Sequence, residues 1–363
     1  MSTEVIIMGG FLLLILFVLM IDLLVIGRHT HVVTTKEAGI WSVVWILLSL
    51  SFYVFLRFYG HLLHGIETPE ELATVVTKYA PEMRFKSSDF EAMMNEYRNH
   101  MSMNYLTGYF IEKTLSIDNI FVILLILQGF SVPLRNYKEV LFWGVLGAIV
   151  LRFAFIFAGS ALIQRFDWIL YFFGAFLVFQ GIKILVKREG PPKDPHEYAI
   201  VKFLSKYLNI TKVYHGDKFA FKENGKWFFT PLLLVLVLVE FTDVIFALDS
   251  IPAIFSVTLD PYIVFFSNIF AIIGLRALFF LLANMVDKFR FLNVGVSVLL
   301  IFVGIKLLAH SWLEVIGYKA SYSLYFIGIT ITLSIVFSIL FPGKVLPIEN
   351  LKTLEEQESK NMR

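Results

Sequence analysis

The chain has 363 residues, of which 58% are hydrophobic and only 17% are charged, and it contains 38 Phe. Soluble domains are roughly 45–50% apolar, so this composition predicts a polytopic membrane protein. The net charge of +2 argues against nucleic-acid binding, and the absence of cysteine excludes disulfide scaffolds, Cys-ligated zinc and thiol nucleophiles.

The expected fold is all-α, a bundle of about nine transmembrane helices. Each span needs about 20 mostly apolar residues. The first apolar run lacks a basic leader and a clear small-residue cleavage site, so it is predicted to be a retained span rather than a signal peptide. In chain order the spans are expected near 5–26, 40–58, 105–128, 139–160, 167–186, 229–257, 262–283, 291–310 and 322–341.

The distribution of basic residues predicts the orientation. If the N-terminus is outside, the inner segments carry 19 Lys and Arg and the outer segments carry six. The positive-inside rule therefore predicts a multi-pass membrane protein with its N-terminus outside and its C-terminus in the cytoplasm. The lipid bilayer is the expected partner, and protein partners are unknown.

The spans and loops divide the chain into seven parts. Two loops are longer than connectors need to be, and the outer one is expected to hold a short surface helix at SSDFEAMMNEYRNHM. The parts are two N-terminal helices (1–60), an extracytoplasmic loop (61–104), a first three-helix repeat (105–186), a basic cytoplasmic loop (187–228), a second repeat (229–310), a final helix (322–341) and a cytoplasmic tail (342–363).

The two three-helix units match each other in sequence. EKTLSIDNI (112–120) matches DVIFALDSI (243–251), GVLGAIVLRFAF (144–155) matches NIFAIIGLRALF (268–279), and LVFQGIKIL (177–185) matches LIFVGIKLL (300–308). Acids, arginines and lysines pair in the same order. Because three is odd, the second unit must be inverted relative to the first, which is typical of secondary transporters.

Five carboxylates lie inside apolar segments: Glu112, Asp118, Glu240, Asp243 and Asp249. A charge at the centre of a bilayer costs about 2.5–3.5 kcal/mol on insertion scales, so these acids need partners, water or a bound cation. Glu112 and Asp118 are six residues apart, about 9 Å along a helix and about 240° around it. For the acids to converge, the helices are expected to be broken near 118–119 and near 249–252, where Pro252 frees a carbonyl.

These acids are candidate ligands of a hard divalent ion. Carboxylate, carbonyl and water oxygens favour Mg²⁺, Ca²⁺ or Mn²⁺ over Zn²⁺ or Cu²⁺. Supporting polar groups are expected from four neutral residues: Asn119, Thr242, Ser250 and Asn268.

An alternative is that the acids only pair with intramembrane cations. Lys183 and Lys306 lie near the ends of their spans, where long cationic side chains reach water. The expected structural charge partners are Lys113, Arg152 and Arg276. Both interpretations stay open at this point.

The motifs EKTLSIDN, LVEFTDVIFALDSIPAIF and SNIFAIIGLRALFFLL, in this order, resemble the TerC/Alx family of bacterial membrane proteins over about 40–341. The resemblance implies a cation exporter of three-plus-three helices with a role in manganese efflux and homeostasis, and a historical link to tellurium resistance. It assigns the five acids as the motif residues. The tellurium link has no evident basis in this sequence, which has no thiol and whose acids would repel an oxyanion.

The expected function is therefore export of divalent cations, most of all Mn²⁺, through an acidic midplane site, with protons as a candidate coupling ion. Mn²⁺ is then a transported substrate, and no permanently bound cofactor is expected. The chain is not expected to be an enzyme; the alternative in that class is an intramembrane aspartyl hydrolase using Asp118 and Asp249. A third alternative is a membrane partner that helps to load metal into, or insert, other membrane or exported proteins.

Overall fold

The computed structural model describes residues 3–27, 35–166, 168–186, 199–211, 213–223, 225–283, 291–309, 312–313 and 320–341. The cytoplasmic tail predicted at 342–363, and part of the basic loop predicted at 187–228, lie outside these ranges. Within the helices, the side chains of Asp118 and Asp249 are also outside the description.

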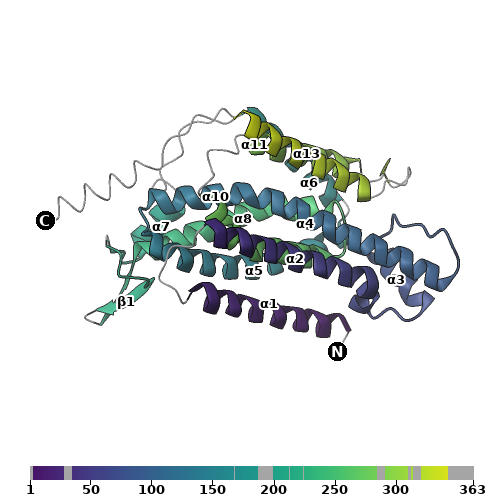
Figure 1. Cartoon of the computed structure of the whole chain (residues 1–363), viewed down its shortest axis with the longest axis horizontal. Helices are drawn as coiled ribbons and strands as arrows, with labels where there is room; N and C mark the ends of the chain where they lie inside the picture. Colours follow the sequence, from purple (N-terminus) through teal and green to yellow (C-terminus); the bar gives the residue numbers. More distant parts are fainter. Residues whose placement is uncertain are drawn as a thin grey trace.

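The described residues are mostly helical, and the helices lie roughly side by side in a bundle (Figure 1). The one described sheet is a short antiparallel hairpin. The elements are α1 (Thr3–Gly27), α2 (Thr35–Tyr59), the 3₁₀ helix η1 (Gly60–His64), α3 (Pro69–Tyr79), α4 (Phe90–Gly129), α5 (Leu134–Arg165), α6 (Trp168–Val186), α7 (Ala199–Tyr207), β1 (Ala220–Glu223), β2 (Lys226–Phe229), α8 (Pro231–Phe255), α9 (Pro261–Ile273), α10 (Leu275–Ala283), α11 (Leu292–Leu308) and α13 (Ala320–Leu340).

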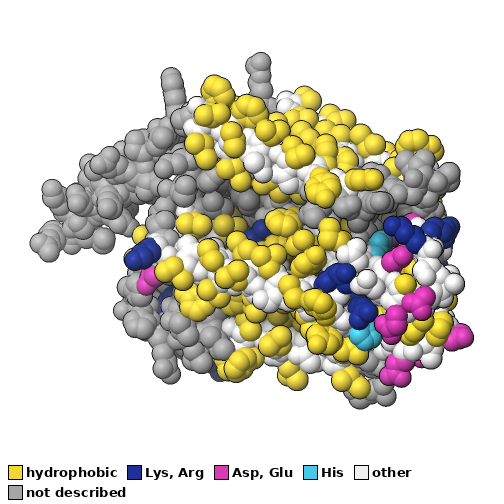
Figure 2. Space-filling view, turned by 45° about the vertical axis from the view of Figure 1, so that its right-hand side comes forward, with side chains coloured by type: hydrophobic (Ala, Val, Ile, Leu, Met, Phe, Trp, Pro, Cys, Tyr) yellow, Lys and Arg dark blue, Asp and Glu magenta, His cyan; other side chains and the backbone are white. Residues whose placement is uncertain are grey.

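Several of these helices are suited to a membrane. Among the described residues, four are long and apolar enough to cross one: 36–64, 134–163, 231–255 and 261–281. Four shorter apolar helices lie at 6–18, 171–186, 294–308 and 325–340. Helix α4, which carries ionisable residues, is in neither set. The flank of the bundle is largely apolar, and acids, bases and histidines gather at the end that holds α3 (Figure 2).

Three details of the helices differ from the sequence-based expectation. Helix α4 runs without interruption from Phe90 to Gly129, so the predicted surface helix at 87–101 is largely the first part of this long helix. Helix α8 also continues through Pro252, which lies only three residues before its end at Phe255. The expected breaks near 118–119 and 249–252 are therefore wrong. The segment predicted as a span at 262–283 lies in one apolar stretch long enough to cross a membrane, 261–281, and this stretch is divided at Gly274 into α9 and α10.

At one end of the bundle, the connection between α4 and α5 is hydrogen-bonded to the segment that precedes β1. Tyr214 donates a hydrogen bond to the Phe130 carbonyl at 2.7 Å, and the Asn136 amide donates to the Gly216 carbonyl at 2.8 Å. Burial raises the pKa of Tyr214 to about 12, so this donor keeps its proton at neutral pH. At the opposite end, His64 of η1 pairs at 2.9 Å with Asp260, which caps the start of α9. The hairpin and α3 accordingly lie at opposite ends (Figure 1).

Helices α6 and α11 pack closely through small residues. A Cβ atom on Gly304 would lie 2.7 Å from the Gly174 carbonyl oxygen, and one on Gly181 would lie 2.8 Å from the Ser297 carbonyl oxygen. Both approaches are closer than a real Cβ tolerates, so the backbones meet here because glycine has no side chain. The pairing of 174 with 304 and of 181 with 297 means that the two helices run antiparallel.

This contact predicts a stability difference between two glycine substitutions. Gly304→Ala should destabilise the bundle by about 1–3 kcal/mol, because the added methyl group overlaps α6. Gly328→Ala in α13 is the matched control, since nothing lies within 4 Å of its Cβ position; it should be neutral or stabilise by up to about 1 kcal/mol through helix propensity. Thermal unfolding in detergent checks this, and equal midpoints for the two variants would contradict the close packing.

Candidate functional site

Arg152 of α5 lies at the centre of a buried polar cluster. Its side chain is 0% exposed. Its Nη1 atom donates to Glu112 of α4 and to Asn268 of α9, and lies 3.4 Å from the Ser250 hydroxyl of α8. Its Nη2 atom donates to Asp243 of α8 at 3.2 Å. One guanidinium therefore receives partners from three other helices.

The cluster follows from the cost of burying charge. A guanidinium stays charged inside a protein, so it needs acceptors that compensate for lost hydration. The two carboxylates supply the charge and the amide and hydroxyl oxygens supply further acceptors. Each carboxylate in turn needs the cation, because Glu112 is 1% and Asp243 14% exposed. The pairing thereby fixes α4, α5, α8 and α9 relative to one another.

Glu240 has different surroundings from the other two acids. It lies one turn before Asp243 on α8, and its carboxylate lies directly against Gly147 of α5, where a Cβ atom would overlap it. The Glu240 residue is partly exposed, but its Oε2 atom is buried and has no hydrogen-bond partner in the part of the chain that the structure describes. An unpartnered buried carboxylate is costly and calls for a proton or a cation. Glu112 Oε2 is likewise buried and has no hydrogen-bond partner in the described part of the chain.

Lys113 faces away from the cluster toward the end of α9. Its ammonium donates to the Ala271 carbonyl at 3.2 Å and lies close to Gly274. The last carbonyls of a helix have no partner within that helix, and a cation at a helix C-terminus is favourable. Lys113 was expected to pair with the acids, and the described contact is instead with the backbone. Arg276 is buried in α10, one residue beyond its start.

The neutral candidates divide into two groups. Ser250 and Asn268 contact Arg152 and belong to the cluster. The Thr242 hydroxyl donates to the Val239 carbonyl of its own helix at 2.8 Å, so it serves the backbone. Asn119 is buried in α4.

The predicted acids are thus brought together only in part. Glu112 and Asp243 meet at Arg152, and Glu240 lies beside Asp243. The side chains of Asp118 and Asp249 lie outside the described structure, so their place in the site stays a prediction. Within the described residues no group of three or more His, Asp or Glu is arranged to hold a metal ion. The alternative of internal ion pairing accounts for Glu112 and Asp243, and it does not account for Glu240.

Two residues of the site were not singled out from the sequence. Gly147 makes room for the Glu240 carboxylate, and the Ser116 hydroxyl donates to Glu112 at 3.3 Å. A glycine within a spanning helix is a signal of close packing, and Gly147 lies in the quoted motif GVLGAIVLR. A serine one turn after an acid is a weaker signal, because most such hydroxyls bond to the backbone.

The family of the chain follows from comparison with known proteins. Residues 97–345, which include all the residues of the cluster, match the model of the integral membrane protein TerC family. The chain belongs to the TerC family. No solved structure matches it.

Similar proteins cover from 59% to 92% of the chain. A protein of Escherichia coli (strain K12) named "Putative membrane-bound redox modulator Alx" is 42% identical over 335 residues, 92% of this chain and 91% of that protein. An "Uncharacterized membrane protein STKORF319" of Myxococcus xanthus is 42% identical over 82% of each chain. An "Uncharacterized membrane protein" of Rickettsia felis is 45% identical over 59% of this chain and 71% of its own length.

Replacing Arg152 tests the charge balance of the cluster. Arg152→Met should destabilise the fold by about 3–5 kcal/mol, because it leaves two buried carboxylates without their cation. Adding Glu112→Gln and Asp243→Asn should recover part of the loss. Arg84→Met is the control, since Arg84 is exposed and donates only to the Pro81 carbonyl. The measurement is thermal unfolding in detergent, and a triple variant no more stable than Arg152→Met would contradict the pairing.

A size exchange tests the contact between Glu240 and Gly147. Gly147→Ala should destabilise by about 1–3 kcal/mol by displacing the carboxylate. Glu240→Asp shortens the acid by one methylene, so the double variant Gly147→Ala/Glu240→Asp should regain most of that loss. Gly159→Ala on the same helix is the control, because its nearest contact would be an ordinary 3.6 Å. Additive losses in the double variant would count against the contact.

Proposed function

We propose that this TerC family protein exports divalent metal cations, most of all Mn²⁺, through a site between α4, α5, α8 and α9. The observation that carries the proposal is the Glu240 carboxylate, whose buried Oε2 atom has no described hydrogen-bond partner and which lies beside Asp243 inside a membrane bundle. A stable fold does not need such a group, and a transporter does. The proposed ligands are the five acids Glu112, Asp118, Glu240, Asp243 and Asp249.

The arrangement of the helices supports two inverted repeats. In the sequence match, Gly174 corresponds to Ser297 and Gly181 corresponds to Gly304. The close contacts pair Gly174 with Gly304 and Gly181 with Ser297, so exchanging the repeats converts one contact into the other. Helix α4 packs on α9 as its counterpart α8 packs on α5. A two-fold relation of this kind would place the cation site at the repeat interface.

The positions of the connections agree with the proposed topology of nine spans. Residues 129–138 and 210–229, both assigned to the cytoplasm, contact each other at one end of the bundle. His64 and Asp260, both assigned to the outside, pair at the other end. We place the N-terminus outside and the C-terminus inside a bacterial inner membrane on these grounds together with the positive-inside rule.

The chemistry of the donors supports a hard cation. Carboxylates and the neutral oxygens of Ser250 and Asn268 suit Mn²⁺ or Mg²⁺, and the sequence contains no cysteine that would favour a softer metal. The single positive charge of Arg152 already balances one of the negative charges of the Glu112 and Asp243 carboxylates in this arrangement. A cation would therefore bind by engaging Glu240 and the free side of the Glu112 and Asp243 carboxylates. Protons are the proposed counter-ion, because carboxylates that lose a cation in a membrane must be neutralised again.

The printed name of the Escherichia coli relative refers to redox modulation. The present chain has no cysteine, so thiol–disulfide exchange is not open to it. The other class of function is a membrane partner that supports metal loading or insertion of other proteins. Such a protein would not move Mn²⁺ by itself, which gives a clear experimental distinction.

The test is Mn²⁺ transport by the purified chain in proteoliposomes with a pH gradient, read by an internal metal-sensitive dye. The wild type should transport Mn²⁺. Asp118→Asn and Asp249→Asn should each lower the rate by about tenfold or more, because even outer partners of metal ligands change affinity by roughly 10–100-fold. Asp217→Asn, an exposed acid in the loop before β1, is the control and should transport normally.

Two outcomes would contradict the proposal in different ways. Transport that is unchanged in both acid variants would exclude these side chains as ligands. A folded wild type that moves no Mn²⁺ would favour the assembly role.

A further inference from the structure

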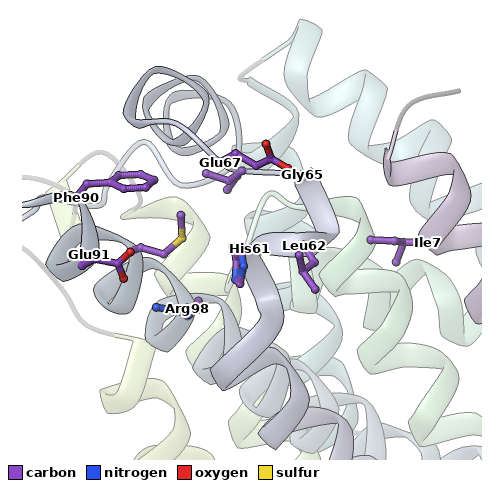
Figure 3. Close-up of a pocket in the computed structure, with 10 residues that line it drawn as sticks. Ile7, His61, Leu62, Gly65, Glu67, Phe90, Glu91 and Arg98 are labelled. Atoms are coloured by element: carbon purple, nitrogen blue, oxygen red, sulfur yellow. The ribbon is translucent and has the colours of Figure 1, made fainter.

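A cleft of about 570 Å³ lies at the end of α2, far from the Arg152 cluster in the fold. Its walls come from α1, η1, the link to α3 and the beginning of α4. In Figure 3, His61 and Leu62 of η1 lie between Glu91 and Arg98 of α4 on one side and Ile7 of α1 on the other. The cleft therefore combines segments that are distant in the sequence.

Two nitrogen atoms of the lining residues lack partners. His61 Nδ1 and Arg98 Nε are buried, and neither has a hydrogen-bond partner in the part of the chain that the structure describes. The Arg98 guanidinium is held in place through Nη1, which donates to the Phe58 carbonyl at 3.0 Å. Arginine offers only donors, and histidine can offer one at Nδ1. These two side chains are suited to an oxyanion such as a phosphate group.

The opposite charge lines the same cleft. Glu67 and Glu91 both line it and are exposed, so their carboxylates are available to a cation. A plain anion would be repelled by these two acids. A zwitterion that carries a phosphate and an ammonium group would satisfy both pairs at once.

The apolar part of the lining indicates what the zwitterion is attached to. Ile7, Leu62 and Phe90 contribute apolar surface, and Leu62 is 45% exposed. The neighbouring Phe58 and Tyr59 at the end of α2 are 59% and 55% exposed. The apolar span that contains α2 ends at residue 64, so the cleft lies where hydrocarbon gives way to headgroups and water.

From this juxtaposition we infer that the cleft binds the headgroup of a zwitterionic phospholipid of the phosphatidylethanolamine type. Arg98 and His61 hold the phosphate, Glu67 and Glu91 hold the ammonium group, and the acyl chains follow the exposed apolar face of α1 and α2. The inference does not depend on the proposed transport. A bound lipid would tie α1 to η1 and α4, because all three contribute to the cleft.

The test is native mass spectrometry of the delipidated full-length chain in detergent, titrated with dioctanoyl phosphatidylethanolamine, dioctanoyl phosphatidylglycerol or inorganic phosphate. The wild type should bind phosphatidylethanolamine about tenfold more tightly than phosphatidylglycerol, as expected for one additional charge-assisted contact. Arg98→Gln should weaken phosphatidylethanolamine binding by about tenfold. Arg84→Gln, which alters an exposed arginine outside the cleft, should leave it unchanged. Glu67→Gln/Glu91→Gln should bring the two lipids to similar affinity.

Each other result overturns the inference. Equal binding of both lipids by the wild type would remove the role of the acids. Undiminished lipid binding by Arg98→Gln would show that the lipid binds elsewhere. If Arg98→Gln does not fold, the variant Glu67→Gln/Glu91→Gln still tests the cleft through the ratio of the two lipid affinities. If inorganic phosphate at the same concentration as the lipid saturates the cleft and prevents lipid binding, the cleft is a site for the free anion only.

Discussion

The interaction on which the rest of the structure depends is the burial of one arginine among carboxylates inside an apolar bundle. Arg152 cannot lose its charge, and Glu112 and Asp243 cannot be buried as anions without it. Because these residues lie on α5, α4 and α8, and Asn268 adds α9, the pairing decides how the four central helices meet. Helices α6 and α11 pack on each other separately, through small residues.

This arrangement gives the proposed site an internal cation. Among the described side chains, two carboxylates pair with one guanidinium, and the Oε2 atom of Glu240, beside Asp243, has no hydrogen-bond partner. An arriving divalent ion would compete with Arg152 for Glu112 and Asp243 and would gain Glu240 as a new ligand. Such competition lets the same carboxylates stay compensated with and without the metal, which a carrier that releases its substrate requires. Gly147 contributes by leaving space for the third carboxylate.

Much of the fold could be predicted from the sequence because hydrophobic length determines where helices cross a bilayer. The positions of the acids were informative for the same reason, since their cost marks them as functional or paired. The expected break at Pro252 was wrong because a proline near the end of a helix disrupts only its last turn, and Phe255 already ends α8. The division at Gly274 was not predicted from the sequence, and neither was the contact of Lys113 with the Ala271 carbonyl beside it. Which acid pairs with which base depends on tertiary packing, so Arg152 could be named as a partner but not assigned to Glu112 and Asp243.

The central claim is that a divalent cation binds between α4 and α8, in contact with Glu240 and the carboxylates around Arg152. Anomalous diffraction from crystals soaked in Mn²⁺ tests it most directly, because the signal locates the metal itself. The account predicts a peak within coordination distance of Glu240 and of at least one of Asp118, Asp243 and Asp249, and its loss in Glu240→Gln/Asp249→Asn crystals. A structure with ordered side chains, saturating Mn²⁺ and no peak at these acids would contradict it.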